Sequence, residues 1–237
     1  MKVKQDSIER LKSRFVHLPI VQFLRHKSSY SQTGEDKIVF QYLVSRGIKM
    51  NQVTYLDLGS GHPSVGSNTY FFYLLGAKGV LIDPNSRLQR WAKLVRRKDK
   101  VITAAVAAQS RESYFWEFHS HQYSTFDEIQ ANSLLGQGLE LRKKTKVTTI
   151  GIEDAFQIYL NNFKQSPLTI LSIDIEGLDF ECIKCFPFNL SRPTIIIIEE
   201  IARDIKAKSE IEEHLQKHQY QLYAFTGLSG VYVSLRA

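Results

Sequence analysis

Four acidic residues stand at the ends of short apolar runs along the 237-residue chain. They are Asp57, Asp83, Asp174 and Glu199. Each run has the length and composition of a strand that is buried on both faces. In open parallel sheets, ligands bind at the carboxyl ends of the strands, where the strand order reverses. The four residues therefore mark where a ligand site is expected.

The segment Asp57-Leu58-Gly59-Ser60-Gly61 follows the first of these strands directly. Glycines in such a turn let the backbone pass close to a ligand. Asp83 lies about 24 residues beyond Gly59, which is the spacing at which an acid on the second strand meets the hydroxyl pair of a ribose. The two features together predict a cofactor that contains a nucleoside.

This glycine loop differs from the loops that bind a pyrophosphate or a triphosphate. A dinucleotide-binding loop has a third glycine where this chain has Ser64, and the Lys-Ser/Thr pair of a P-loop is absent. The carboxylate of Asp57 would repel a phosphate but attract the amino group and sulfonium of S-adenosylmethionine. The residues thus favour methyl transfer over hydride transfer by a nicotinamide enzyme. A structural role for Asp57, as the cap of the following turn, is the alternative.

The elements that would position these residues alternate between strands and helices. Strands are expected at residues 53–58, 79–82, 101–107, 114–118, 146–150, 168–173 and 194–198. Helices are expected at residues 35–44, 69–75, 87–97, 152–163, 180–186 and 210–217. Two last strands at 220–225 and 231–235 flank a glycine-bearing loop and predict an antiparallel hairpin. The pattern predicts an α/β fold with a mostly parallel, doubly wound sheet.

A set of short motifs also follows one another in a characteristic order and spacing. The motifs are Tyr30-Ser31-Gln32-x-Gly34-Glu35-Asp36, Tyr55-Leu56-Asp57-Leu58-Gly59-Ser60-Gly61-His62-Pro63, Ser67-Asn68-Thr69-Tyr70-x-Phe72-Tyr73, Gly79-Val80-Leu81-Ile82-Asp83-Pro84-Asn85, Ser124-Thr125-Phe126 and Leu171-Ser172-Ile173-Asp174-Ile175-Glu176-Gly177. Over roughly residues 30–235 the chain resembles the FkbM family of S-adenosylmethionine-dependent methyltransferases. The resemblance implies a class I, Rossmann-like methyltransferase fold with a seven-stranded sheet. It also implies O-methylation, often of sugars in polysaccharides or natural products.

The resemblance implies a role for each residue that matches a family motif. Asp57, Gly59 and Gly61 would line the methionine end of the cofactor, and Asp83 would hold the ribose. Gln32, Ser67 and Asn68 would be their neighbours, while Ala105 and Val106 would flank the adenine. Residues 67–69 also suit the N-cap of the following helix, and the two roles are compatible.

Methylation of a hydroxyl group requires that the hydroxyl lose its proton. Asp174, Glu199 and Glu200 stand at the ends of neighbouring strands, and hard oxygen ligands at this density suit Mg²⁺ or Mn²⁺. Such a metal would bind two sugar hydroxyls and lower the pKa of one of them. The sequence therefore predicts a metal-assisted mechanism as one of two options.

A side-chain base is the other option. His62 lies in the glycine loop and titrates near neutral pH, and Asp174 or Glu176 would act if burial raised its pKa. Two of these residues also have a structural alternative. His62 would be a turn residue before a proline, and Glu176 would be the acid that begins a helix. Asp174 is predicted to be essential because it ends a buried apolar strand, where an unpaired charge is costly.

The net charge of +7 is concentrated in two parts of the chain. Residues 1–29 form a basic extension outside the predicted methyltransferase domain of residues 30–237, with an amphipathic helix expected at 6–18. This helix would pack over the site, join a homodimer or touch an anionic membrane surface. A second basic cluster lies at residues 87–100. No nucleic-acid motif interleaves aromatic residues with these charges, so a nucleic-acid partner is not expected.

Residues 119–144 are polar and contain glycines, so we expect a lid over the acceptor. The expected acceptor is a sugar, a glycan or a glycolipid precursor. The alternatives are a polyketide, lipid or RNA acceptor, or a module that binds S-adenosylmethionine without catalysis.

Neither a membrane-spanning run nor a secretory signal is recognised, and a disulfide framework is excluded because only Cys182 and Cys185 are present. We therefore expect a cytoplasmic protein, on the inner face of the membrane if it is peripheral. The two cysteines fall within an expected helix and are interpreted as packing residues.

Overall fold

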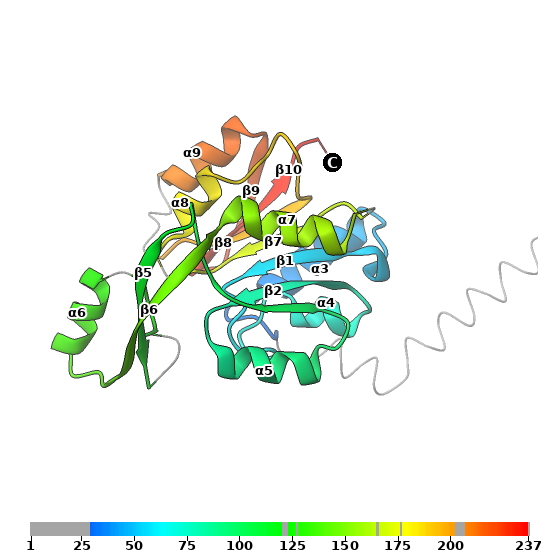
Figure 1. The fold of residues 1–237 in the computed structure, drawn as a ribbon. Coiled ribbons are helices and arrows are strands. Elements are labelled where there is room, and N and C mark those ends of the chain that lie inside the picture. Colours follow the sequence, from blue (N-terminus) through cyan, green and yellow to red (C-terminus); the bar gives the residue numbers. More distant parts are fainter. Residues whose placement is uncertain are drawn as a thin grey trace, which may run out of the picture.

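The computed structural model describes residues 29–119, 123–126, 128–164, 166–175, 177–201 and 207–236. Seven strands form the main sheet in the order β3-β2-β1-β7-β8-β10-β9 (Figure 1). Their bounds are Thr54–Leu58 (β1), Lys78–Asp83 (β2), Lys100–Thr103 (β3), Ile170–Ile173 (β7), Ile195–Glu199 (β8), Tyr220–Phe225 (β9) and Ser229–Ser234 (β10). Strand β10 pairs antiparallel with both β8 and β9, and the other pairs are parallel. The predicted mostly parallel sheet with an antiparallel C-terminal hairpin is thus confirmed.

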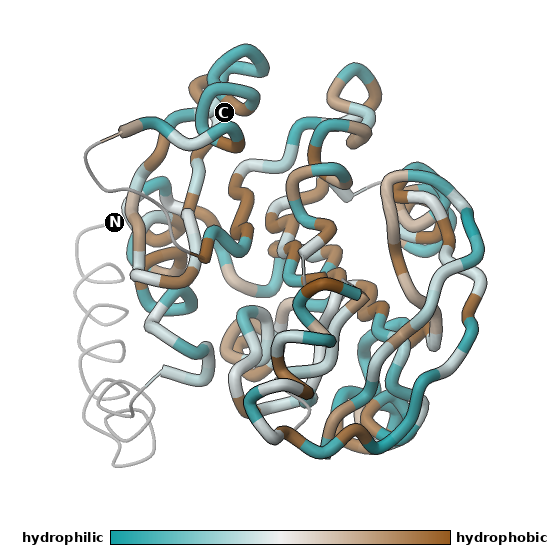
Figure 2. Tube along the Cα trace, turned by 90° about the vertical axis from the view of Figure 1, so that its left-hand side faces the viewer, coloured by the Kyte–Doolittle hydropathy of each residue, from teal (hydrophilic) through white to brown (hydrophobic). Residues whose placement is uncertain are grey.

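Side chains alternate along the strands and fill two hydrophobic cores, one on each face of the sheet. Leu56, Leu58 and Ile82 belong to the first core, whereas Tyr55 and Leu81 belong to the second. The first core packs against α7 (Ile152–Asn162), α8 (Asp179–Lys184) and α9 (Glu210–Lys217). The second core packs against α3 (Glu35–Ser45), α4 (Tyr70–Leu74) and α5 (Ser86–Val95), and a short 3-10 helix, Met50–Gln52, precedes β1. Figure 2 shows hydrophobic residues concentrated along the central strands.

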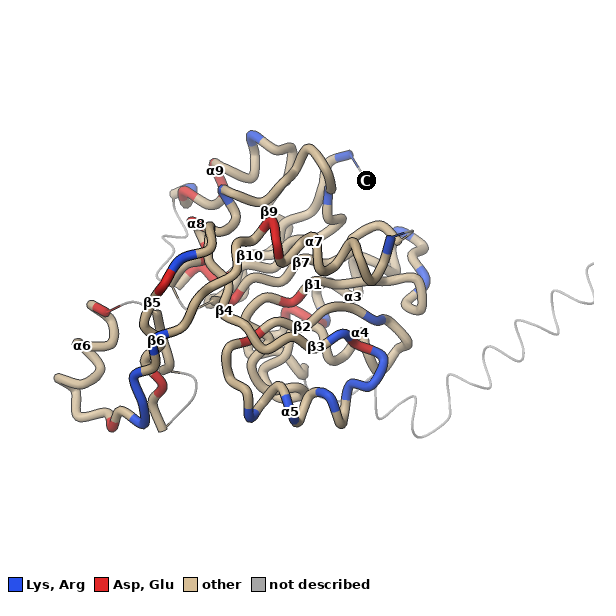
Figure 3. The backbone as a smooth tube through the Cα atoms, viewed as in Figure 1, with Lys and Arg blue, Asp and Glu red and all other residues tan. Residues whose placement is uncertain are grey.

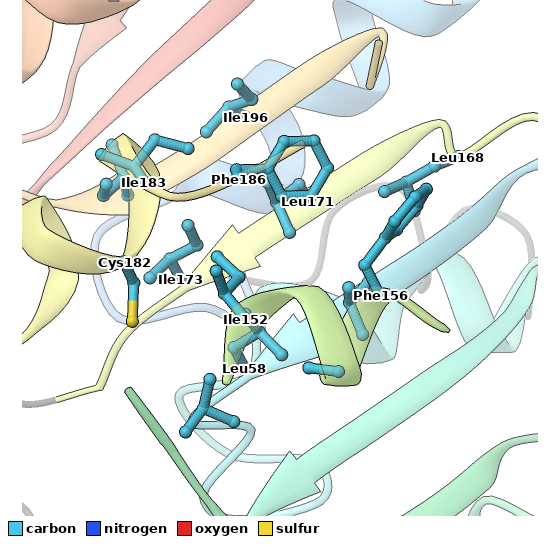
Figure 4. Packing of buried hydrophobic residues seen from close by; sticks show 14 of the residues in the cluster. Leu58, Ile152, Phe156, Leu168, Leu171, Ile173, Cys182, Ile183, Phe186 and Ile196 are labelled. Carbon is cyan, nitrogen blue, oxygen red and sulfur yellow. The ribbon is translucent and has the colours of Figure 1, made fainter. Parts of the chain in front are cut away.

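The first core also accounts for the cysteine pair. Figure 4 shows Cys182 of α8 beside Ile152, Ile173 and Ile183. Cys182 is fully buried and Cys185 is half-buried, and both are free thiols. Burial raises the pKa of the Cys182 thiol well above its ordinary value, which keeps the thiol protonated. The interpretation of these cysteines as packing residues is supported.

The single strand expected at residues 101–107 is wrong. After β3 the chain leaves the main sheet at Ala104, whose N–H donates to the carbonyl of Asp83 at 3.2 Å. Residues Ala105–Ala107 form β4, which pairs with β6 (Leu141–Gly151) in a second sheet of order β4-β6-β5. A continuous apolar run does not encode which partner each half will pair with.

A ribbon of β5 (Glu112–Phe118) and β6 carries α6 (Glu128–Gly136) and stands out from the side of the molecule (Figure 1). Strand β6 is longer than the expected 146–150 because its first half pairs with β5 while its side chains remain largely exposed, so no apolar pattern marks it. The expected lid, residues 119–144, contains α6 and the start of β6.

The basic extension of residues 1–29 falls almost entirely outside the described residues, as does its expected helix at 6–18. Among the residues that are described, no helix combines the length and apolarity needed to cross a membrane.

Candidate active site

The site lies where the strand order of the main sheet reverses, between β1 and β7. Here the N–H of Asp174, just after β7, donates to the carbonyl of Leu58 at 2.9 Å. Gly59, just after β1, donates its N–H to Ile82 of β2 at 2.8 Å. The carboxyl ends of three neighbouring strands are therefore held together at the crevice where such sheets bind ligands.

A cavity of about 920 Å³ opens at this point. Eight of the residues singled out in the sequence line it, and they come from six separate segments. They are Gln32, Gly59, Gly61, His62, Asp83, Val106, Asp174 and Glu199. Of the four acidic residues at the strand ends, Asp83, Asp174 and Glu199 line one cavity, and Asp57 does not.

Asp83 fixes the shape of the glycine loop. Its two carboxylate oxygens accept hydrogen bonds from the N–H of Gly61 at 2.9 Å and of Asn85 at 2.7 Å. Gly61 has a φ of 52°, in the left-handed region that favours glycine. Burial raises the pKa of Asp83 to about 6 against the opposing effect of these two hydrogen bonds. Each oxygen retains a second lone pair, so the carboxylate can also accept two hydroxyl groups of a ligand.

Asp57 is turned away from the cavity into a buried polar network. Its carboxylate accepts a hydrogen bond of 2.5 Å from the hydroxyl of Thr69. Burial raises its pKa, and the positive charge of Arg96 opposes this shift. The sequence predicted a cationic ligand near Asp57. In the structure the cation that acts on Asp57 is Arg96, a residue of the protein itself.

Three other predicted cofactor neighbours also lie outside the cavity lining. Ser67 accepts from Arg96 at 3.3 Å, and Asn68 donates to Ser172 at 3.2 Å. Ala105 is buried, while Ala104 and Val106 line the cavity. Alternation along β4 explains the difference, because residues 104 and 106 share a face and residue 105 points the opposite way.

Arg96 is fully buried and ties together the segments that carry Asp57 and Ser67. Its guanidinium donates to Asp99 and to the hydroxyls of Tyr55 and Thr69 at 2.8 to 2.9 Å. The sequence assigned Arg96 to a basic cluster. The i, i+3 spacing to Asp99 was the available signal for a buried pair.

We expect Arg96→Ala to lower the free energy of unfolding by about 3–5 kcal/mol, because it leaves the buried carboxylate of Asp99 without its cationic partner. Urea denaturation measures the loss. The matched control is Arg97→Ala at the next, exposed position, where the change should stay within about 0.5 kcal/mol. Equal losses in the two variants would contradict a special role for the buried network.

The three carboxylates predicted as metal ligands separate into two groups. Asp174 and Glu199 line the cavity, whereas Glu200 points to the opposite face of the strand end. Glu200 accepts hydrogen bonds from Ser209 at 2.7 Å and from the hydroxyl of Tyr232. In the part of the chain that the structure describes, no group of three His, Cys, Asp or Glu side chains could hold a metal ion. The expected three-carboxylate site is therefore not formed.

Glu199 has a shifted ionisation. Burial, with a further contribution from the negative charge of Asp179, raises its pKa to about 7. A carboxyl group with this pKa can accept a proton at neutral pH more effectively than an ordinary glutamate. The sequence identified Glu199 only as a metal ligand, and the structure gives it the properties of a base.

Asp179 was missed in the sequence although it shapes the loop after β7. Its carboxylate accepts from the N–H of Ile175 at 3.0 Å and of Gly177 at 3.1 Å. The sequence pattern that could have indicated this role is an acidic residue at the start of a helix, two residues after Gly177. Glu176, the third predicted catalytic residue, lies outside the described residues.

His62 uses its Nδ1 atom to stabilise its own turn. This atom accepts hydrogen bonds from the N–H of Ser64 at 3.2 Å and of Val65 at 3.0 Å. The imidazole packs against Trp91 in a T-shaped arrangement with ring centroids 4.5 Å apart. Nδ1 is therefore engaged within the loop, and a proton would have to be accepted at Nε2.

One part of the cavity wall is aromatic. Phe115 of β5 and Phe126 contact each other with ring centroids 4.8 Å apart, and Tyr123 lines the cavity beside them. Gln130 and Leu134 of α6 complete this wall, so part of the predicted lid does line the cavity. Trp116 is buried in a small core with Phe118 and Ala131, whereas Phe115 on the other face of β5 lines the cavity, a position that the sequence did not indicate.

A family model described as the methyltransferase FkbM domain matches residues 57–222, well over half of the chain. A search of curated proteins gives no significant match. The matched range includes both the glycine loop and the strand ends that form the cavity.

Proposed function

Since the chain belongs to the FkbM methyltransferase family, we propose that it is an S-adenosylmethionine-dependent O-methyltransferase whose acceptor is a sugar or a glycan precursor. The observation that carries the proposal is the glycine loop held by Asp83 at the rim of the cavity. Glycines that approach a ligand closely, together with an acid at the end of the second strand, suit a nucleoside cofactor.

The residues of the cavity fit S-adenosylmethionine from one end to the other. The carboxylate of Asp83 would accept the two ribose hydroxyls, and Ala104 and Val106 would pack against the adenine. Asp174 would supply negative charge near the amino group and sulfonium, the role first expected of Asp57. The cavity volume of about 920 Å³ leaves room for an acceptor beside the cofactor.

A sugar acceptor suits the carboxylates and the aromatic wall of the cavity. Carboxylates such as Asp174 and Glu199 accept hydrogen bonds from hydroxyl groups. Aromatic rings such as those of Phe115 and Phe126 pack against apolar faces, including the C–H face of a sugar ring. A polyketide or lipid hydroxyl would use the aromatic wall but leave one carboxylate without a hydroxyl to bind.

In the transfer, the acceptor oxygen forms a bond to the methyl carbon as the bond from sulfur to that carbon breaks, and S-adenosylhomocysteine leaves. The bound cofactor supplies the activated methyl group. Glu199 takes the hydroxyl proton, and Asp174 orients the acceptor, so that reacting atoms are held in line. We assign Glu199 to the base rather than to a metal because Glu200, its expected partner in a metal site, bonds to Tyr232 and Ser209.

Titration calorimetry with S-adenosylmethionine and S-adenosylhomocysteine tests the proposal. We expect Asp83→Ala to weaken binding by about 100-fold or more, because two charge-assisted hydrogen bonds are lost. Affinity for the unmodified chain should fall as pH is lowered through about 6, where the carboxyl group of Asp83 becomes protonated.

The control is Asp154→Ala, which removes an exposed carboxylate from α7. Equal affinities of the two variants would contradict the role of Asp83, and no binding of either ligand by the parent chain would overturn the proposal. Binding without turnover on any sugar, glycan, lipid, polyketide or RNA acceptor would instead favour a non-catalytic binding module. Adding Mg²⁺, Mn²⁺ or a chelator during turnover separates the metal-assisted mechanism from the base mechanism.

A further inference from the structure

Helix α5 exposes large apolar side chains to solvent on the side of the molecule next to the cavity. Trp91 is 46% exposed and Leu94 is 67% exposed, and Val95 is also exposed. Residues three and four positions apart lie on the same side of a helix, so these three side chains form one apolar ridge. The opposite side of α5 buries Gln89 and Ala92 against the sheet.

Exposed cations surround this ridge. Figure 3 shows Lys and Arg along α5 and the segment that follows it. The exposed cations are Arg87, Arg90, Lys93, Arg97, Lys98 and Lys100. The acid of this segment, Asp99, is buried in its pair with Arg96 and contributes no exposed negative charge. The exposed charge of residues 86–100 is therefore entirely positive.

An apolar ridge bordered by cations has the composition of a helix that lies in the interface of an anionic bilayer. There the indole and aliphatic side chains enter the boundary between headgroups and acyl chains, while Lys and Arg meet the lipid phosphates. A nucleic acid would also bind the cations, but it offers no apolar partner for Leu94. The charge and the apolar ridge together favour a lipid surface.

The ridge is continuous with the mouth of the cavity. The ring of Trp91 packs against His62, which lines the cavity, and the neighbouring Val65 lines it as well and is largely exposed. A surface that contacts Trp91 therefore lies close to the entrance.

We propose that α5, through Trp91, Leu94 and its surrounding cations, docks the protein on an anionic lipid surface with the cavity mouth beside the headgroups. Docking does not require methyl transfer, so it can hold or fail independently of the proposed function. If both hold, the acceptor is presented at the membrane surface.

Tryptophan fluorescence of the full chain with lipid vesicles tests this contact directly. The chain has two tryptophans, and Trp116 is only 7% exposed, so a vesicle-dependent change reports Trp91. We expect a blue shift, and quenching by brominated lipid, with mixed phosphatidylglycerol and phosphatidylcholine vesicles but not with phosphatidylcholine alone. Binding through residues 1–28 alone, which contain no tryptophan, would leave Trp91 unchanged and would overturn the proposal.

Vesicle sedimentation of variants supplies the second test. We expect Leu94→Ser to weaken partitioning about tenfold, and Arg90→Gln with Lys93→Gln to weaken it by about fivefold for each cation removed. The matched controls are Leu190→Ser, and Lys143→Gln with Lys164→Gln, which remove an exposed leucine and two exposed lysines from other surfaces.

Equal partitioning of the α5 variants and their controls would overturn the proposal. So would a double glutamine variant that loses binding to a single-stranded RNA oligonucleotide while its vesicle binding is unchanged, since that result assigns the face to nucleic acid.

Discussion

Gly59→Ala is expected to abolish cofactor binding and to destabilise the fold severely. A Cβ atom at residue 59 would lie 1.6 Å from the carbonyl oxygen of Asp174 and 2.6 Å from its carbonyl carbon. Both are backbone atoms beside β7, and the N–H of Asp174 is itself bonded to Leu58, so neither segment can move without breaking the contact between β1 and β7. Relief of the clash would separate the two strands at the point where the cofactor is expected to bind.

Gly47→Ala is the matched control for this substitution. Gly47 has a φ of 72°, close to the 76° of Gly59, but a Cβ there would meet nothing within 4 Å. It should therefore cost only the left-handed backbone penalty, about 1–2 kcal/mol, and should leave cofactor affinity unchanged. Urea denaturation and calorimetry of both variants distinguish the cost of a left-handed backbone conformation from the cost of the steric clash with Asp174. Similar stabilities and affinities of the two variants would contradict the close approach of β1 and β7.

The location of the cavity could be predicted from the sequence because it follows from local patterns. Short apolar runs ending in Gly59, Asp83 and Asp174 identify buried parallel strands, and the carboxyl ends of such strands meet at one edge of the sheet. The spacing between Gly59 and Asp83 needs no knowledge of the rest of the chain. These features are confirmed as parts of one cavity.

The direction of each side chain could not be predicted in the same way. Asp57 and Asp83 both end apolar strands, but only Asp57 joins a buried network, in which Thr69 donates to it and the charge of Arg96, a residue far along the chain, acts on it. Glu199 and Glu200 are adjacent, yet only Glu199 faces the cavity. A strand-end pattern gives the position of a carboxylate along the sheet, and long-range partners decide whether it faces the ligand or the core.

Long-range partners also decide the division of residues 100–107 into β3 and β4. The apolar pattern is continuous, but β3 pairs with β2 in the main sheet and β4 pairs with β6 in the second sheet. This division moves Val106 to the cavity wall and brings the β5-β6 ribbon beside it. Phe115 was missed for this reason, since nothing local indicates that the outer face of β5 meets the cavity.

Glu199→Gln is expected to lower kcat by about 10²–10⁴-fold, because glutamine cannot accept the proton of the acceptor hydroxyl. The measurement is the rate of methyl transfer to a sugar or glycan acceptor across the pH range. For the parent chain, kcat/KM should rise with pH to a plateau above about 7, as Glu199 loses its own proton. The variant should lack this ionisation while it binds S-adenosylhomocysteine with nearly unchanged affinity.

Glu200→Gln is the control at the adjacent position. It alters the hydrogen bonds to Ser209 and Tyr232, so it should lower stability and leave the pH dependence of kcat/KM as in the parent. Loss of the ionisation near pH 7 in Glu200→Gln, or its persistence in Glu199→Gln, would exclude Glu199 as the base.

Stability should respond to Glu199→Gln in the opposite direction to activity. The pKa of Glu199 is raised in the folded state from an ordinary value of 4.5 to about 7, so between these values the folded chain binds more protons than the unfolded chain. The free energy of unfolding of the parent therefore falls as pH rises through this window. Glutamine has no proton to lose, so the variant should gain stability over the parent as pH rises, with the full gain above pH 7. A residue that weakens the fold in its ionised form and yet supports turnover is retained for chemistry. Substitution of a purely structural glutamate would instead lower the stability and the activity of the protein together.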